Sequence, residues 1–157
     1  MNQVPLTVPF ESFNLVMALT PWHWLHPRDY TPIMLTAFGD WMLGAPDGSI
    51  HLMSTLEGNV SRIAETNIEF NRLKETQQKR DEWFLEGFVL SLASRGVFLK
   101  AGECFGFEKP PVLGGAIEIG NIKPFPVIVW QSIMGQLHEQ LAKRPPGSKI
   151  SGFVFKE

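Results

Sequence analysis

A run of aromatic residues, glycines and prolines from residue 103 to 115 most restricts how this chain can fold. It reads Glu-Cys-Phe-Gly-Phe-Glu-Lys-Pro-Pro-Val-Leu-Gly-Gly. Gly106, between two phenylalanines, is free to take positive φ, whereas Pro110-Pro111 removes two backbone donors and restricts two φ angles. Gly114-Gly115 then loosens the chain again. We therefore expect a rigid, shaped loop here, without recognisable catalytic chemistry.

Length and composition indicate one globular domain. A chain of 157 residues is typical of a single domain, and it should bury about 68–70% of its unfolded surface. Hydrophobic residues make up 44% and charged residues 19%, which favours a broad buried core and an apolar surface for contact. The net charge of −2 argues against direct binding of nucleic acid. A mildly acidic protein could instead meet a basic partner.

A single cysteine, Cys104, excludes an intrachain disulfide and favours a reducing compartment. The apolar stretch from Leu6 to Leu19 is interrupted by Pro9 and Glu11 and lacks the basic start of a signal peptide. Other segments fall short of the roughly 20 apolar residues that span a membrane. We expect a cytoplasmic protein without membrane contact.

The local patterns predict an α+β domain with a mostly antiparallel sheet. Asp47-Gly48 indicates a tight turn joining two strands of a hairpin. The expected strands cover residues 38–43, 49–54, 59–64, 117–122, 125–129 and 150–155. The expected helices cover residues 10–19, a segment beginning at the Thr66 capping box, a segment from Asp81 to the stop at Gly96, and residues 132–142.

Two kinds of reactive site can be drawn from the residues, and both have a simpler explanation. His23, His26 and Asp29 could approach one metal ion, but a metal site normally needs three or four well-spaced ligands, so packing is the better interpretation. Cys104 could act as a nucleophile with His51 or His138 as base. A lone cysteine beside an acidic residue is more typical of a small buried hydrophobe.

The carboxylates form a third group of candidates, either as acid/base pairs or as contacts for a basic partner. For most of them, a role as a turn residue, a helix cap or a solvated side chain is the simpler explanation. Their expected exposure nevertheless leaves them available for binding. The residues chosen as partner contacts are Asp40, Asp47, Glu57, Glu65, Glu103 and Glu108.

Seven short motifs in a fixed order give the chain a family resemblance. They are Phe-Gly-Asp-Trp at 38–41, Asp-Gly-Ser-Ile-His at 47–51, Thr-Leu-Glu-Gly at 55–58, Glu-Cys-Phe-Gly-Phe at 103–107, Pro-Pro-Val-Leu-Gly-Gly at 110–115, Asn-Ile at 121–122 and Gly-Gln-Leu-His-Glu-Gln at 135–140. Together they resemble the C-terminal domain of immunity proteins that neutralise DNase toxins of type VI secretion systems. The resemblance covers roughly residues 36–150.

The resemblance implies a compact SUKH-like α+β domain with helices packed on one side of the sheet. Members often carry a preceding GAD-like module, for which the first 35 residues are too few, so we expect residues 1–35 to form a short cover and residues 36–157 to form the domain. The motif residues expected to be structural are Gly39, Trp41, Gly48, Trp83, Gly106, Pro110, Pro111, Gly114, Gly115, Gln136 and His138.

The resemblance also implies a function without catalysis, cofactor or metal. Such a protein would bind its cognate toxin, a nuclease, and block the active site or the path of the substrate. Two alternatives stay open: a non-catalytic adaptor or ligand-binding module of the same fold, and a thiol enzyme using Cys104. For a ligand-binding module, a pocket beside Trp41 and Trp83 is the first place to look.

Overall fold

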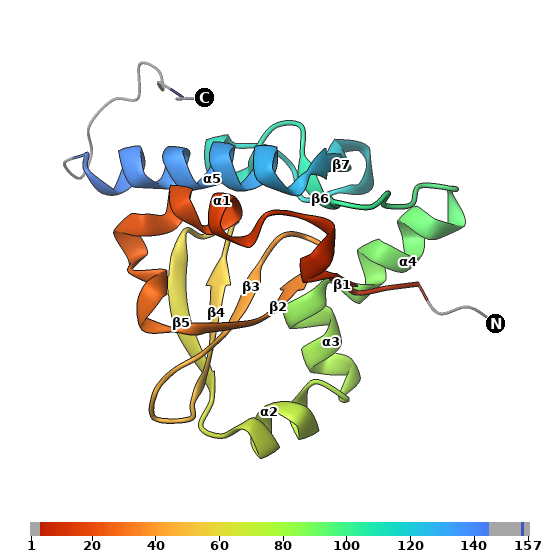
Figure 1. The fold of residues 1–157 in the computed structure, drawn as a ribbon. Coiled ribbons are helices and arrows are strands. Elements are labelled where there is room, and N and C mark those ends of the chain that lie inside the picture. The colour runs from red at the N-terminus through yellow and green to blue at the C-terminus, as the bar shows by residue number, and fades with distance from the viewer. Residues whose placement is uncertain (1–3, 145–154, 156–157) are drawn as a thin grey trace.

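A five-stranded antiparallel sheet forms the centre of the protein (Figure 1). The computed structural model describes residues 4–144 and 155. The strands follow each other in chain order across the sheet, and a separate two-stranded ribbon lies beside it. The sheet consists of β1 (Thr7–Val8), β2 (Thr31–Thr36), β3 (Trp41–Gly44), β4 (Ile50–Ser54) and β5 (Asn59–Ala64), and the ribbon of β6 (Glu103–Phe107) and β7 (Ile122–Pro126).

Five α-helices and several short 3-10 segments surround the sheet in the described part of the chain. Because these elements are short, most of them depend on packing against the sheet for their stability. The α-helices are α1 (Leu15–Leu19), α2 (Asn67–Leu73), α3 (Gln77–Phe84), α4 (Glu86–Ser94) and α5 (Val127–Ala142), and the 3-10 turns are η1 (Phe10–Ser12), η2 (Thr20–Leu25), η3 (Pro27–Asp29), η4 (Pro111–Leu113) and η5 (Ile119–Asn121). The predicted α+β class with an antiparallel sheet is confirmed.

The predicted hairpin is confirmed as β3 and β4, with Leu43 opposite His51. Asp47 stabilises the turn, because its Oδ1 accepts a hydrogen bond from the Ser49 backbone nitrogen at 2.9 Å. The first strand of the hairpin begins at Trp41 and not at residue 38, since Gly39 lies in a turn with φ of +82°. The predicted strand at 59–64 is confirmed as β5.

Residues 4–35 contribute to the sheet as well as covering it. β1 pairs with the end of β2, and β2 pairs with β3. The predicted helix over residues 10–19 is divided into the turn η1 and the short helix α1. In η2, Trp22 is fully buried and Trp24 donates to the Gly135 carbonyl at 3.1 Å, so the tryptophan-rich segment packs against α5.

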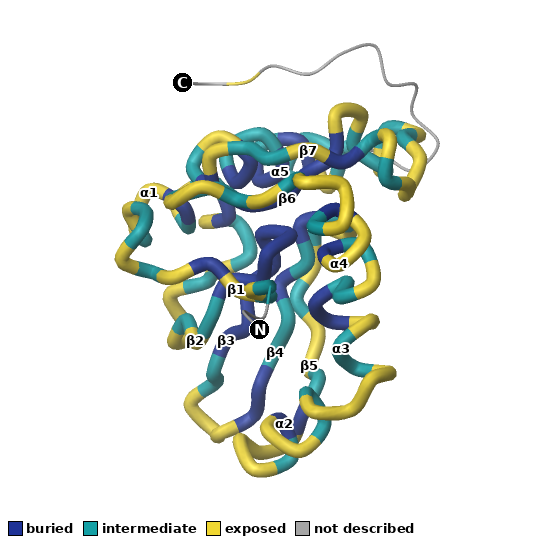
Figure 2. The backbone as a smooth tube through the Cα atoms, turned by 90° about the vertical axis from the view of Figure 1, so that its right-hand side faces the viewer, coloured by how far each residue is buried: buried dark blue, intermediate teal, exposed yellow. Residues whose placement is uncertain are grey.

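Helices cover both faces of the sheet, and their expected placement on one side is corrected here. Along β3, Met42 belongs to a core with Phe70 of α2 and Trp83 of α3. Its neighbours Trp41 and Leu43 face the opposite way, into the larger core that holds residues of η2, α4 and α5. Since successive side chains of a strand alternate, all three residues are buried only when both faces are covered. Figure 2 shows these buried strands between the outer elements.

The run from 103 to 115 begins as a strand, which corrects the expectation of a loop throughout. Residues 103–107 form β6, paired with β7. A Cβ atom on Gly106 would lie 2.6 Å from the Trp130 ring, so this glycine is required by close packing and not by positive φ. The strands expected at 117–122 and 125–129 are replaced by β7 alone. Residues 110–115 form a turn as predicted, which includes η4.

The start of α2 agrees with the prediction, whereas the bounds of α3, α4 and α5 differ from it. Thr66 caps α2 as expected, accepting from the Glu69 backbone nitrogen at 3.1 Å. The helix predicted from Asp81 to Gly96 is instead two helices divided at Leu85. α5 begins at Val127, five residues before the predicted start. The strand predicted at 150–155 lies almost wholly outside the described residues. Each helix in the described part of the chain is too short or too polar to cross a membrane.

Candidate partner-binding site

An acidic pocket lies between β5 and the junction of α3 with α4, and we take it as the candidate binding site. Its volume is about 250 Å³. Figure 2 shows α3 and α4 running beside β5. One wall comes from β4 and β5, the other from the end of α3. Its lining residues are Asp40, Leu52, Ser54, Leu56, Glu57, Asn59, Ser61, Ile63, Glu82, Trp83 and Leu85.

Asp40 is the most buried charged residue of the pocket, with 7% of its surface exposed. Its Oδ1 accepts two hydrogen bonds from Thr55, one from the backbone nitrogen at 2.8 Å and one from the hydroxyl at 3.0 Å. These bonds join the β2–β3 turn to the β4–β5 turn. Asp40 therefore fixes the end of the sheet where the pocket opens.

Burial raises the pKa of the Asp40 carboxyl to about 6, because a charged group is poorly solvated in the protein interior. The hydrogen bonds from Thr55 oppose this shift, and the negative charge of Glu57 adds to it. At neutral pH the carboxyl is mostly ionised. The pocket therefore holds a buried carboxylate, and keeping this carboxylate ionised destabilises the free protein.

Two further carboxylates stand at the exposed rim of the pocket. The Glu57 carboxylate accepts a hydrogen bond from the side-chain amide of Asn59 at 3.5 Å. Glu82 forms an ion pair with Lys79 at 2.9 Å, and the Lys79 ammonium lies 5.5 Å from the centre of the Trp83 ring. The charge of Glu82 is thus compensated within α3. Within residues 4–144 and 155, neither Asp40 nor Glu57 forms an ion pair.

The pocket wall includes a residue in an unfavourable backbone conformation. Leu85 has φ of +52° and ψ of +44°, in the left-handed region that non-glycine residues rarely adopt. It ends α3 and immediately precedes α4, so the bend that it produces redirects the chain at the pocket. Such a conformation costs a non-glycine residue on the order of 1–3 kcal/mol, and helices often end in it.

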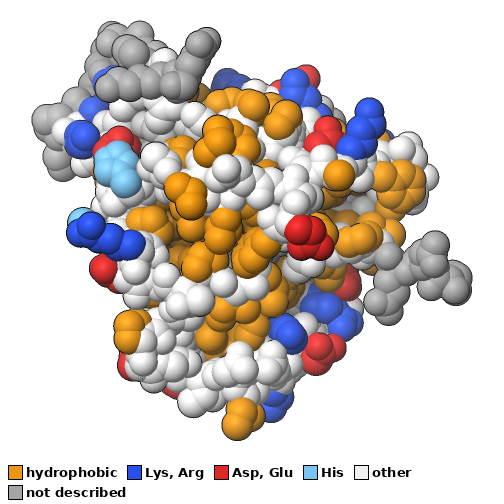
Figure 3. All heavy atoms as spheres, viewed as in Figure 1, with side chains coloured by type: hydrophobic (Ala, Val, Ile, Leu, Met, Phe, Trp, Pro, Cys, Tyr) orange, Lys and Arg blue, Asp and Glu red, His pale blue; other side chains and the backbone are white. Residues whose placement is uncertain are grey.

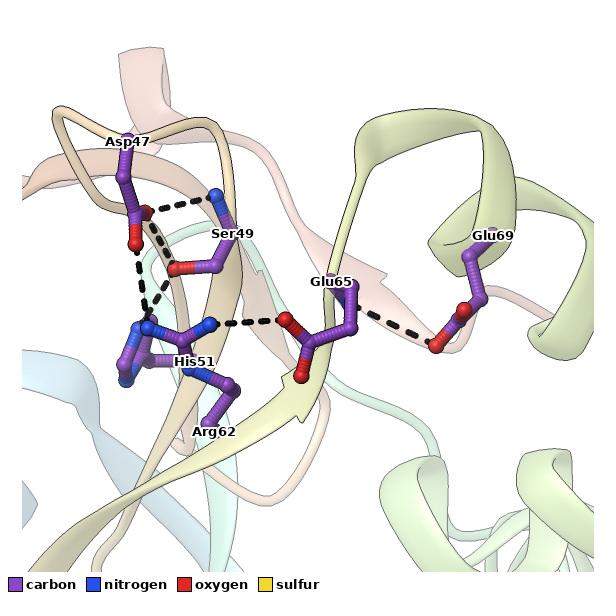
Figure 4. A network of polar contacts seen from close by, with 6 residues as sticks. All are labelled: Asp47, Ser49, His51, Arg62, Glu65 and Glu69. Atoms are coloured by element: carbon purple, nitrogen blue, oxygen red, sulfur yellow. Dashed lines mark hydrogen bonds and ion pairs between the residues drawn. The ribbon is translucent and has the colours of Figure 1, made fainter.

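Two of the predicted contact residues lie at the opposite end of the sheet, in a network of their own (Figure 4). Arg62 joins them, with one nitrogen 3.0 Å from Asp47 and another 2.8 Å from Glu65. Hydrogen bonds from Ser49 and the nearby Arg62 lower the pKa of Asp47 to about 2. The structure thus separates the pair Asp47 and Glu65 from the pair Asp40 and Glu57.

The last two predicted contact residues lie on the β6–β7 ribbon. Glu103 accepts a hydrogen bond from the Lys100 backbone nitrogen at 2.7 Å, and Glu108 forms an ion pair with Lys123 at 3.3 Å. Both are engaged in local interactions. The six predicted carboxylates are therefore divided among three regions, and only Asp40 and Glu57 line a pocket together.

Trp41 and Trp83 do not share a pocket. Trp83 lines the acidic pocket, whereas Trp41 is fully buried on the other face of the sheet. The Trp41 indole donates to the side-chain oxygen of Gln131. Sequence patterns did not single out Gln131, because the predicted helix began at residue 132 and glutamine is ordinarily exposed.

The residues considered for a thiol nucleophile and for a metal site lie outside the acidic pocket. Burial raises the pKa of the Cys104 thiol far above its usual range, and the nearby carboxylates of Asp40 and Glu103 add to this effect. His51 shares a hydrogen bond with the Ser49 hydroxyl, and His138 with the Thr55 carbonyl. As for metals, no cluster of three His, Cys, Asp or Glu side chains suited to an ion occurs within the described residues.

A larger, mainly apolar hollow of about 620 Å³ lies between α1 and the start of β2. Its lining includes Leu15, Leu19 and Tyr30. Nearby, the side chains of Val16 and Met17 are more than half exposed. Hydrophobic side chains gather at the centre of this face of the molecule in Figure 3. This apolar surface is separate from the acidic pocket, since the two share no lining residue.

Comparison with known proteins supports the resemblance seen in the motifs. Residues 64–138 match the family described as T6SS immunity protein Tdi1, C-terminal. A search of curated proteins found no match. A solved structure, titled "Crystal structure of Atu4351 from Agrobacterium tumefaciens", is similar with 18% sequence identity and a TM-score of 0.48. That similarity covers 77% of this chain and 60% of the other. The predicted resemblance to type VI immunity proteins is therefore confirmed by the family match.

Proposed function

We propose that this protein is an immunity protein, which binds a cognate toxin of a type VI secretion system and prevents it from acting in the producing cell. The observation that carries this proposal is the match of residues 64–138 to the C-terminal region of such a protein. This segment runs from the end of β5 into α5 and includes the α3–α4 junction beside the acidic pocket.

We further propose that the toxin is a nuclease and that binding covers its active site or the path of its substrate. A nuclease binds phosphates through basic residues, so its cleft is complementary to an acidic surface. The pocket with Asp40 and Glu57 supplies such a surface on a protein with a net charge of −2. The inhibitor itself would act in the cytoplasm and have no turnover. The buried Cys104 thiol supports this non-catalytic role.

Coexpression with the toxin encoded by the adjacent gene tests this proposal. Cells that produce the toxin alone should stop growing, and cells that also produce this protein should grow. The two purified proteins should form a stable complex by size-exclusion chromatography and calorimetry. Absence of both rescue and binding would contradict the immunity role.

A DNA-cleavage assay tests the nuclease part separately. The toxin should degrade DNA, and an equimolar amount of this protein should stop the degradation. If the toxin is neutralised but has another activity, immunity stands and the nuclease assignment is wrong. Isolation of a dominant partner unrelated to any toxin would instead favour the adaptor hypothesis.

A further inference from the structure

We infer that the acidic pocket receives a lysine side chain of the bound toxin, with the lysine ammonium group at the Asp40 carboxylate. This inference rests on the proposed function and specifies which part of the partner the pocket holds. It applies to the pocket between β5 and the α3–α4 junction and not to the other carboxylates. Four observations carry it.

The first observation is that one oxygen of the Asp40 carboxylate accepts no hydrogen bond from the described residues. Oδ1 of Asp40 accepts both hydrogen bonds from Thr55, whereas Oδ2 has no hydrogen-bond donor among the described residues. Asp40 is 93% buried and lines the pocket. Oδ2 is not among the fully buried side-chain atoms that lack a partner in the described part of the chain, so it is open to the pocket. A group that enters the pocket from outside can supply that donor.

The second observation is the composition of the walls. Apolar side chains of Leu52, Ile63 and Leu85 line the passage, and the carboxylates of Asp40 and Glu57 supply the negative charge. This arrangement suits a long side chain that has an apolar stem and a cationic end. Lysine fits better than arginine, because one free carboxylate oxygen cannot receive the paired donors of a guanidinium group.

The third observation is the lack of an internal cation. Lys79 is the basic residue near the rim, and it already pairs with Glu82 at 2.9 Å. In the part of the chain that the structure describes, Asp40 and Glu57 have no cationic partner. A metal ion is a poorer occupant, since these residues do not form a cluster of three ligands suited to one.

The fourth observation is that two features of the site lower the stability of the free protein. The pKa of Asp40 is raised to about 6 by burial, so its charged form destabilises the fold at neutral pH. Leu85 adds the cost of a left-handed backbone conformation. Costs of this kind are typical of binding sites, where a partner compensates for them.

The test compares the affinities of Asp40→Asn and Glu118→Gln for the purified toxin by calorimetry. Each substitution replaces a carboxylate by an amide, but Glu118 is an exposed residue outside the pocket. We expect Asp40→Asn to weaken binding by about 30-fold or more, as is typical when one member of a buried ion pair is lost. Glu118→Gln should bind as the wild type does.

A second variant keeps the test decisive if Asp40→Asn does not fold. Ser61→Lys introduces a lysine at an exposed position of β5 that lines the pocket. Its ammonium group should occupy the pocket and weaken toxin binding to a similar extent. Wild-type affinity in the folded variants, within about twofold, would overturn the lysine assignment while leaving the immunity role intact. A wild-type protein that does not bind the toxin would instead contradict the proposed function.

Discussion

The Gln131 side-chain oxygen accepts a hydrogen bond from the Trp41 indole nitrogen at 3.0 Å, which joins α5 to β3 across 90 positions of the chain. The same oxygen accepts from the Trp22 indole at 2.7 Å, and the Gln131 amide donates to the Gly39 carbonyl at 2.7 Å. All of these groups are buried. One glutamine thus connects the N-terminal segment, the sheet and the last helix.

Replacing Gln131 by leucine should destabilise the fold. Two indole nitrogens and one carbonyl would lose their partner inside the core, and each unsatisfied group costs about 1–3 kcal/mol. We expect the free energy of unfolding in urea to fall by about 3 kcal/mol or more. Gln78→Leu is the control, since Gln78 is exposed on α3 and should change stability little. Equal effects of the two substitutions would contradict the role given to Gln131.

Gly58→Ala should be far more damaging than Gly48→Ala. Both glycines have positive φ, +69° and +89°, so both substitutions carry backbone strain of about 1 kcal/mol. A Cβ atom on Gly58 would lie 2.3 Å from Cγ of His138, whereas one on Gly48 would meet nothing within 4 Å. We expect overpacking to add about 1–3 kcal/mol at Gly58 alone. Urea unfolding of both variants measures the difference, and equal losses would refute the packing explanation.

Asp40 should make the protein less stable as pH rises from about 4 to about 7. Its folded-state pKa of about 6 exceeds its unfolded value of 3.8, so the folded state binds more protons between these values. The free energy of unfolding therefore decreases with rising pH in this window, by about 3 kcal/mol from this group. Asp40→Asn should remove that component and be the more stable protein at pH 7.5.

Asp47 provides the control for this pH dependence because its pKa is shifted the other way. Its folded-state value of about 2 lies below 3.8, so its stabilisation is present above pH 4 and is lost as pH falls toward 2. Asp47→Asn should therefore leave the decrease between pH 4 and pH 7 in place. Unfolding curves across this range separate the two groups, and an unchanged profile for Asp40→Asn would contradict the assignment.

The Cys104 thiol should be unreactive in the folded protein. It is fully buried, and its pKa is raised by burial and by neighbouring carboxylates, so little thiolate forms. Ellman's reagent should react with it only slowly in buffer and rapidly in concentrated urea, where the thiol is exposed. Rapid reaction in buffer would reopen the thiol-enzyme hypothesis.

Local signals predicted the parts of the fold that involve neighbouring residues. The Asp47-Gly48 turn, β5, the Thr66 cap and the stop at Gly96 are all present. Each depends on contacts within a few residues, so the determining groups stand together in the sequence. The family resemblance rested on more distant motifs, and the match of residues 64–138 confirms it.

Errors arose where packing from elsewhere decided the local structure. Gly106 belongs to a strand that pairs with β7, and Trp130 packs so close to it that only glycine fits there. Leu85 divides a helix that periodicity predicted as continuous. β2 pairs with β3, and β1 in turn pairs with β2, so the first two strands depend on the sheet for their hydrogen-bond partners.

The candidate site, too, was predicted only in part, because its geometry depends on distant segments. Its acidic residues Asp40 and Glu57 could be chosen from the sequence, along with four others that the structure places in different regions. Their shared pocket and the raised pKa of Asp40 could not be predicted, since both require the β4–β5 turn and α3 to enclose the carboxylate.

The sequence by itself determined the turn at Pro110-Pro111, because prolines restrict the backbone wherever they occur. The run from 103 to 115 also contributed two of the seven ordered motifs that determined the family resemblance. The tertiary structure alone decided that its first half is a strand beneath Trp130 and that Asp40 meets Thr55 at the mouth of a pocket. Backbone preferences are local, whereas burial and the resulting charge energetics depend on which distant segments pack together.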